Sequence, residues 1–384
     1  MSLESELRTQ VARILAATHA KDLFGTLRGG QKDQTAGAFA LFTAYQRTLE
    51  SFRQVTGDIE ESESAEQQLI TIWREALRLI SLGTYPCLED RVPDRTDTFA
   101  VNLGGQTFSI IEKIAVGDIA DVFLCVNDVG RRAILKVAHQ NRDADVFTRE
   151  VTSLRFAKAN EKYGELLSKY TPGVIDTFKV DIGGGETRPA TLFDFVSEHF
   201  TLDEIREVYP DGVDTRHMNW MFNRLLEFMI LTHSSGVIHG ALLPHHIMVH
   251  AVSHGVVVID WTASVLGFES RLGEHISVVT KRCREFYPPE VWEKVPANPT
   301  IDLYMAAMCA KYVLGCPLDQ TVCPERMPPE VWSVLLECTD PDPSGRPTHL
   351  LRFYERYQKI LRGIYGPRSY TTFTMPTATS VVRR

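Results

Sequence analysis

Residues 237–250 read VIHGALLPHHIMVH, and residues 256–261 read VVVIDW. The runs IMV and VVVI are short, apolar and rich in β-branched residues, which predicts two buried strands. A loop precedes the first of these runs, and Asp260 ends the second. Such loops carry the reacting groups of many enzymes, yet residues 237–250 contain neither Asp nor Glu. The stretch therefore predicts a loop that leads into a buried strand and that carries histidines but no acid.

The whole chain has 384 residues, of which 44% are hydrophobic and 23% are charged, and its net charge is -8. This length and composition predict a globular protein of two or three domains. The negative charge disfavours nucleic acid as a partner. No apolar run is long enough to cross a bilayer, and the charged start MSLESELRTQ is no signal peptide. Seven scattered Cys favour reduced thiols, so we expect a cytoplasmic protein without a membrane partner.

Hydrophobic periodicity divides the chain into four regions. Residues 1–88 carry apolar residues at helical spacing, which predicts an all-α domain. Residues 89–195 hold a polar linker, strand-like segments and one helix, whereas residues 196–366 are mostly helical and residues 367–384 predict a flexible tail. The fold class is therefore predicted to be α+β. One apolar stripe at helical spacing is expected in the core: Met218, Met221, Phe222, Leu225 and Met229.

Further motifs accompany the opening stretch. They are IAVGDIADVF (114–123), AILKVA (133–138), FTREVTSLRF (147–156), YPPEVW (287–292), TIDLYMAAMCAKYVLG (300–315) and DPDPSGRPTHLL (340–351). In this order they resemble the protein kinase superfamily over about residues 100–362. The resemblance implies a bilobal fold with a β-rich N-lobe (89–195) and a helical C-lobe (196–366). It also implies ATP and Mg²⁺ as ligands.

The resemblance also implies a set of nucleotide-binding residues. Lys136 stands where kinases contact the phosphates, with Glu150 as its expected ion-pair partner. Two of the three positions of the glycine-rich loop are alanine here, which stiffens the loop. The candidates for nucleotide contacts are Ala115, Gly117, Ala120, Val122, Lys136, Glu150, Phe193 and Phe195. Two alternatives remain: an ordinary hairpin at residues 114–123, and an edge-strand lysine that only adds solubility.

The opening stretch resembles the kinase catalytic loop, with its essential positions changed. His239 matches the first residue of the family's His-Arg-Asp, but Ala241 stands at the position of the catalytic Asp. His246 stands at the position of the metal-binding Asn, and Asp260 matches the magnesium-binding Asp. The pair His-Gly is similar to the aminoglycoside-type phosphotransferases, which read His-Gly-Asp. The alternative for Asp260 is a capping residue after a buried strand.

Three residues have structural roles by the same resemblance. Glu290 in YPPEVW and Arg346 in SGRPT are expected to form a buried ion pair. Asp302 is expected to anchor the backbone of the catalytic loop. These motifs favour the protein kinase C-lobe over the small-molecule phosphotransferase branch. Zinc binding by the neighbouring histidines His245 and His246 is disfavoured, because their spacing fits no standard site.

Three functions follow as hypotheses. The first is a pseudokinase that binds a nucleotide and acts as a regulatory or scaffolding module, because Ala241 can neither orient nor deprotonate a hydroxyl group. The second is an active, atypical Ser/Thr protein kinase that transfers the γ-phosphate of ATP. The third is a co-chaperone-like or structural assembly protein that binds no nucleotide.

The N-terminal helices weakly resemble a J-domain, the module that stimulates a heat-shock ATPase. The segments AYQRTLESFRQVTGD and AEQQLITIWREALRLISLG match its helices, but Arg53-Gln54-Val55 replace the essential His-Pro-Asp turn. Any amphipathic three-helix bundle would give the same pattern. We therefore expect a docking role, with protein partners bound through residues 1–88 or through the C-lobe.

Overall fold

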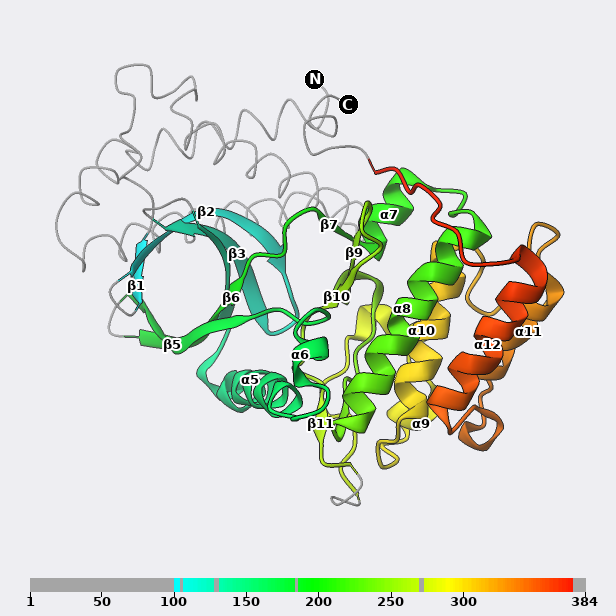
Figure 1. Ribbon diagram of the computed structural model, residues 1–384. Coiled ribbons are helices and arrows are strands. Elements are labelled where there is room, and N and C mark those ends of the chain that lie inside the picture. The colour runs from blue at the N-terminus through cyan, green and yellow to red at the C-terminus, as the bar shows by residue number, and fades with distance from the viewer. Residues whose placement is uncertain (1–99, 104–105, 128–130, 184–185, 269–272, 376–384) are drawn as a thin grey trace, which may run out of the picture. The chain divides into compact units, whose positions relative to one another are not determined.

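The computed structural model describes residues 100–375 except 104–105, 128–130, 184–185 and 269–272 (Figure 1). The predicted all-α domain, the linker after it and residues 376–384 lie outside the described residues. The described chain has a mixed α+β fold, as the sequence predicts, with one curled antiparallel sheet and several helices. Within that part of the chain, no helix combines the length and the apolarity that a membrane span requires.

Contacts divide the chain into two compact units. The sheet unit contains described residues 100–144 and 174–195, and the helical unit contains residues 145–173 and 196–375. The sequence analysis grouped residues 145–173 with the strands, whereas they pack with the helical unit. The reason lies in helix α5 (Ala144–Lys158), whose buried Ser153 accepts a hydrogen bond of 2.6 Å from Ser264.

The sheet unit is a six-stranded sheet in the order β1-β2-β3-β4-β6-β5, with all neighbours antiparallel (Figure 1). Its strands are β1 (Ala100–Leu103), β2 (Gln106–Val116), β3 (Ala120–Asn127), β4 (Arg132–Ala138), β5 (Val174–Gly183) and β6 (Glu186–Asp194). Two register shifts interrupt the β2–β3 pairing, and such irregularities bend a sheet. The buried core consists of Phe108, Cys125, Ala133, Leu135, Ala190 and Leu192.

The helical unit is built on α8 (Thr215–Ser234) and α10 (Thr300–Val313), which pack against each other. Its other helices are α5, α6 (Gly164–Leu167), α7 (Leu202–Val208), α9 (Pro289–Trp292), α11 (Pro329–Cys338) and α12 (Leu350–Tyr365). Strands β7 (His199–Thr201), β9 (Ile247–His250) and β10 (Val256–Val258) form one small sheet. Strand β8 (Val237–Ile238) pairs with β11 (Val265–Leu266).

Local sequence explains the start and the packing of α8. Asp214 caps the helix, because its side chain accepts a hydrogen bond of 2.8 Å from the backbone N–H of Arg216. The predicted core stripe is confirmed, since each member is at most 3% exposed: Met218, Met221, Phe222, Leu225 and Met229. Burial of each such side chain is worth about 1.5–3 kcal/mol. The stripe therefore makes α8 the central support of the helical unit.

The C-terminal segment differs from its prediction. We expected a flexible tail from residue 367, but residues 367–375 pack on the helical unit, and Phe373 is only 3% exposed. The ring of Phe373 lies 5.6 Å from that of Tyr209 and 4.9 Å from that of His217. The segment has no periodicity because it forms neither helix nor strand. Aromatic contacts hold it in place together with hydrogen bonds, among them one of 2.9 Å from the Tyr370 hydroxyl to the backbone oxygen of Val252.

A buried ion pair joins the start of α9 to the chain before α12. Arg346 donates hydrogen bonds of 2.5 and 3.0 Å to the two carboxylate oxygens of Glu290. The side chains are 0% and 4% exposed. Arg346 also donates to the backbone oxygen of Asp340 at 2.7 Å. The start of α9 and the segment before α12 are therefore fixed to each other by a bidentate contact with little access to water.

Neutralising Glu290 should destabilise the protein strongly. Glu290→Gln leaves the Arg346 charge buried without its counter-ion, which should lower the free energy of unfolding by about 3–5 kcal/mol. Glu337→Gln is the matched control, because its pair with Arg356 is partly exposed, at 34% and 49%, and should cost less than about 1 kcal/mol. Urea denaturation at neutral pH measures both. Equal losses in the two variants would contradict this account of the buried pair.

Candidate functional site

The loop after β8 makes a sharp turn that only glycine can occupy. Gly240 has φ +76°, in the left-handed region. A Cβ added at this position would lie 2.7 Å from the backbone oxygen of Ala263 and 2.6 Å from Ile276 Cδ1. The turn leads from β8 into the short 3-10 helix Pro244–His246. The sequence HG at 239–240 is thus required by backbone geometry.

The buried carboxylate of Asp302 on α10 holds this loop. Its Oδ2 accepts a hydrogen bond of 2.8 Å from the backbone N–H of His239, and its Oδ1 accepts one of 2.8 Å from that of Gly240. His233 Nε2 on α8 lies 2.9 Å from Oδ2 and donates to it. Burial alone would raise the pKa of Asp302, but the hydrogen bond and charge of His233 hold it below its usual value. The carboxylate is therefore ionised and fixes the loop in one conformation.

His239 is a packing residue of the loop. Its side chain is 0% exposed and lies edge-on to the ring of Trp261, with 5.0 Å between ring centroids. Burial lowers the pKa of His239 to about 4, although Asp302 opposes this shift. Its Nδ1 accepts a hydrogen bond of 3.3 Å from the backbone N–H of Ala241. A neutral, enclosed imidazole of this kind supports the loop and does not reach a substrate.

His246 and Asp260 face each other. His246 Nδ1 lies 2.9 Å from the backbone oxygen of Ala241, and must donate because a carbonyl oxygen can only accept. In the neutral ring, Nε2 therefore carries a lone pair, and it lies 3.7 Å from Asp260 Oδ2. The methyl group of Ala241 is 3% exposed. The loop thus presents an imidazole nitrogen toward a carboxylate, and no acid stands at the position of Ala241.

Asp260 has a constrained backbone. Its φ is +59°, which is uncommon for a residue with a side chain. Thr262 fixes the carboxylate, because its hydroxyl donates to Asp260 Oδ1 at 2.5 Å and its backbone N–H lies 3.4 Å from the same oxygen. The side chain is 26% exposed. Strain of this kind is often found at functional sites, and here it orients Oδ2 toward His246.

Glu150 of α5 is tied to the residue after Asp260. Its side chain is 2% exposed, and Oε1 accepts a hydrogen bond of 3.1 Å from the backbone N–H of Trp261. The indole ring of Trp261 is fully buried, and its N–H donates to the backbone oxygen of Val258. The position of the acid at 260 therefore depends on α5 as well as on the strand that precedes it.

The sheet unit carries the remaining candidates. In the β2–β3 hairpin, Gly117 N–H donates to the backbone oxygen of Ala120 at 2.7 Å, while Ala115 is exposed. Lys136 lies in β4, which is an inner strand between β3 and β6, so the edge-strand alternative for this lysine is wrong. Lys136 is 6% exposed and pairs in register with Val122. A buried ammonium group is costly without an anionic partner.

The two aromatic candidates at the end of β6 have different environments. Phe193 is buried, with 6% of its surface exposed. The ring of Phe195 lies under the guanidinium group of Arg132, at 4.2 Å from its centroid. Phe193 is thus covered by the sheet unit, and Phe195 is in contact with Arg132. Their roles as nucleotide contacts remain predictions, as does the pairing of Lys136 with Glu150 of the other unit.

The sequence analysis did not identify two residues that hold the site in place. His233 completes the surroundings of Asp302, and Thr262 fixes Asp260. The segment LTHSSG gave no signal for His233, because the contact joins residues 69 positions apart. Thr262 could have been found, since a Thr two residues after an Asp commonly bonds to it.

No known protein-family model matches the sequence. Among the described residues, no group of three or more His, Cys, Asp or Glu side chains is arranged to hold a metal ion. A cation at His246 and Asp260 would therefore have two protein donors and would need the rest of its ligands from a bound molecule or from water. The pair suits a cation held jointly with a substrate more than a permanent structural metal.

Replacing Asp302 should loosen the loop in a pH-dependent way. Asp302→Asn keeps the shape but sets an amide N–H against a backbone N–H, so the free energy of unfolding should fall by about 3 kcal/mol at pH 7. Because the folded-state pKa of Asp302 is lowered from 3.8, its stabilisation is complete above that value and is lost as pH falls through the folded pKa. The difference between wild type and variant should shrink below about pH 4.

Urea denaturation of both proteins between pH 7 and pH 2 measures this difference. Asp211→Asn serves as control, because Asp211 is exposed and should give no such trend. A gap between wild type and Asp302→Asn that stays constant over the whole range would contradict an ionised Asp302 in the folded protein.

Proposed function

We propose that the chain is a kinase-like protein that binds a nucleotide and has lost efficient phosphoryl transfer. The sheet unit corresponds to the N-lobe and the helical unit to the C-lobe. In this proposal the protein acts as a pseudokinase, a regulatory or scaffolding module. The observation that carries it is the position of Asp260 opposite His246, on whose loop Ala241 stands at the position that the resemblance assigns to the catalytic Asp.

Several independent contacts support the kinase-like assignment. Asp302 accepts hydrogen bonds from the loop backbone at His239 and Gly240. Arg346 and Glu290 form the buried pair that the resemblance implies. Lys136 lies on an inner strand beside the hairpin that carries Gly117. A chance likeness in sequence would not be expected to give all three of these structural features.

The chemistry of the loop supports loss of transfer. Phosphoryl transfer depends on positioning and on charge neutralisation, with an Asp that orients the attacking hydroxyl. The side chain of Ala241 offers no acceptor, and the titratable side chains of residues 237–250 are all histidines. His239 is enclosed, and His246 Nδ1 is used by the Ala241 carbonyl. Absence of the positioned base alone costs about 10²–10⁴ in rate.

The donors at His246 and Asp260 also suggest which cation accompanies the nucleotide. A divalent cation would supply neutralisation of phosphate charge at this site. Asp260 provides a carboxylate oxygen, but His246 provides an imidazole nitrogen whose other ring nitrogen is anchored to a carbonyl oxygen, as in metal-binding histidines. Mg²⁺ prefers oxygen donors, whereas imidazole favours transition metals. We therefore expect Mn²⁺ to support nucleotide binding better than Mg²⁺.

Protein partners complete the proposal. A pseudokinase acts through the proteins that it binds, and residues 1–88 together with the helical unit are the proposed docking regions. This assignment rests on the helical pattern of residues 1–88. The chain segment 1–88 would not need chaperone-stimulating activity for such a role.

A thermal-shift titration tests the nucleotide. ATP with Mn²⁺ should raise the melting temperature more than ATP with Mg²⁺. Lys136→Met and Asp260→Asn should each weaken binding by at least about tenfold, because each removes a charge that faces phosphate or cation. Lys179→Met, on an exposed position of β5, is the matched control and should bind as wild type. His246→Asn should reverse the preference toward Mg²⁺.

The same proteins test the loss of transfer. Incorporation of labelled phosphate from ATP into the chain or a general protein substrate should equal the level given by Lys136→Met. No thermal shift with either cation would remove the nucleotide from the proposal. Phosphate transfer by wild type that Lys136→Met abolishes would instead identify an active kinase.

A further inference from the structure

One buried carboxylate holds the β2–β3 hairpin close to its turn. Asp121, the second residue of β3, is 6% exposed. Its Oδ2 lies 2.8 Å from Lys113 Nζ of β2, and its Oδ1 lies 3.1 Å from Nε2 of His139, the residue that follows β4. A carboxylate can only accept, so both nitrogens donate. We call Asp121, Lys113 and His139 the clip, because they join β2, β3 and the end of β4.

The turn of the hairpin, residues 117–119, is tight and is bonded to the same part of the sheet. Gly117 N–H donates to the backbone oxygen of Ala120 at 2.7 Å, and a Cβ added to Gly117 would lie 3.1 Å from that oxygen. The backbone oxygen of Ile119 accepts a hydrogen bond of 2.8 Å from the backbone N–H of His139. His139 therefore holds the hairpin through its backbone as well as through its ring.

The ladder and the packing contribute little at this point. A register shift interrupts the β2–β3 pairing between Lys113 and Ala115, and such irregularities disrupt the ladder locally. Residues 115–118 are all exposed, so no core contact fixes the tip of the hairpin. A buried carboxylate is costly unless its donors are present, and charge-assisted hydrogen bonds are the stronger ones. The position of the turn therefore depends on the contacts of Asp121.

The clip and Lys136 lie on opposite faces of the sheet. Asp121 pairs in register with Val137, and Val122 pairs with Lys136. Successive side chains of a strand point to opposite faces, and Val137 packs against the buried core. Asp121 therefore shares the core face, whereas Lys136 belongs to the other face. The acid acts on the hairpin and not on the ammonium group of Lys136.

We propose that Asp121 is a positioning residue for nucleotide binding, because the clip keeps the backbone of residues 117–119 where it meets the phosphates. Backbone N–H groups of a tight turn suit an anion of this kind. The inference rests on the proposed function. Only molecules with the turn in place would bind fully, so the apparent Kd rises as that fraction falls. The effect should concern the phosphates and spare the adenine and the ribose.

Calorimetric titration of the full chain with ATP and with adenosine, each in the presence of Mn²⁺, tests this role. Asp121→Asn keeps the shape but removes the charge that holds Lys113. The Kd for ATP should rise about tenfold, as for a turn in place in about a tenth of the molecules, whereas the Kd for adenosine should stay as in wild type. An unchanged Kd for ATP, or an equal rise for both ligands, would overturn the positioning role.

A second variant approaches the clip from its more accessible member. The side chain of Lys113 is 16% exposed and that of Asp121 is 8% exposed, so Lys113→Met disturbs the sheet less. It should also raise the Kd for ATP. Because the two residues act through one contact, the double variant should bind ATP no more weakly than Asp121→Asn alone. Full additivity of the two effects would contradict the clip.

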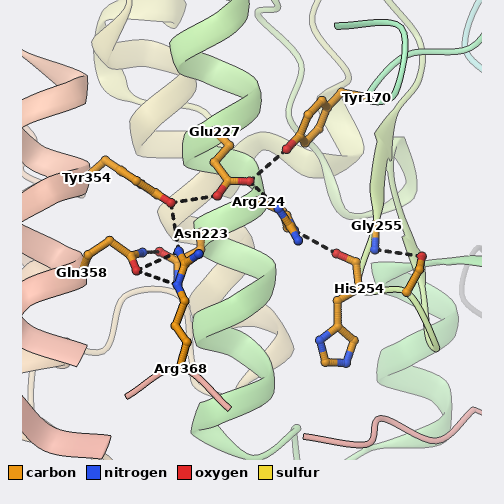
Figure 2. A network of polar contacts seen from close by, with 10 residues as sticks. Tyr170, Asn223, Arg224, Glu227, His254, Gly255, Tyr354, Gln358 and Arg368 are labelled. Atoms are coloured by element: carbon orange, nitrogen blue, oxygen red, sulfur yellow. Dashed lines mark hydrogen bonds and ion pairs between the residues drawn. The ribbon is translucent and has the colours of Figure 1, made fainter. Parts of the chain in front are cut away.

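The matched control is a shared carboxylate of the helical unit. Glu227 accepts hydrogen bonds from Arg224 Nη1 at 2.7 Å, from the hydroxyl of Tyr170 at 2.9 Å and from that of Tyr354 at 2.8 Å (Figure 2). Glu227→Gln removes a charge from a polar network in the same way, but the residues that it contacts all belong to the helical unit. It should leave both Kd values unchanged. A rise for ATP equal to that of Asp121→Asn would point to general loss of stability and would contradict the proposal.

Amide hydrogen exchange without nucleotide separates this inference from the proposed function. Exchange of the Gly117 N–H reports opening of the turn, and it should be about tenfold faster in Asp121→Asn than in wild type. If wild type binds ATP and the exchange of Gly117 is the same in both proteins, the positioning role alone is refuted. If wild type binds no ATP, the proposed function is refuted, and this inference falls with it.

Discussion

The carboxylate of Asp302 is inaccessible to water and takes hydrogen bonds from the loop backbone at His239 and Gly240 and from the side chain of His233. An ionised acid in such a place is costly unless all of its donors are present. The hydrogen bonds that compensate this burial form only when α8, α10 and the loop adopt one arrangement. That arrangement sets the backbone of Ala241, which in turn orients His246 through its Nδ1. The chemistry of the loop is thus fixed by a residue that never meets a ligand.

In the proposed kinase-like protein, Ala241 stands on this firmly held loop at the position of the residue that would take a proton. The groups that the proposal assigns to charge binding are Asp260, which is held by Thr262, and the imidazole of His246, whose Nε2 lies 3.7 Å from Asp260 Oδ2. The proposal assigns Lys136, which lies on an inner strand, to the same category. Retention of binding groups with loss of the base explains why we favour a protein that uses a nucleotide as a ligand and not as a reagent.

The sequence predicted much of this arrangement because its motifs are local. The strands around Lys136, the stripe on α8 and the acid at 260 each follow from residues close together in the chain. What it missed depends on contacts between distant residues. His233 meets Asp302 across 69 positions, and α5 packs with the helical unit through Ser153 and Ser264, which are 111 apart. The docking of Phe373 on Tyr209 and His217 has no periodic signature, since the segment is extended.

The central claim is that Lys136 contacts the phosphates of a nucleotide. An acyl-phosphate derivative of ATP transfers its acyl group to a lysine that lies beside the bound phosphates, and mass spectrometry then identifies the modified residue. The account predicts modification concentrated on Lys136 and suppressed by excess ATP. Modification spread over exposed lysines such as Lys179, with no protection by ATP, would contradict it.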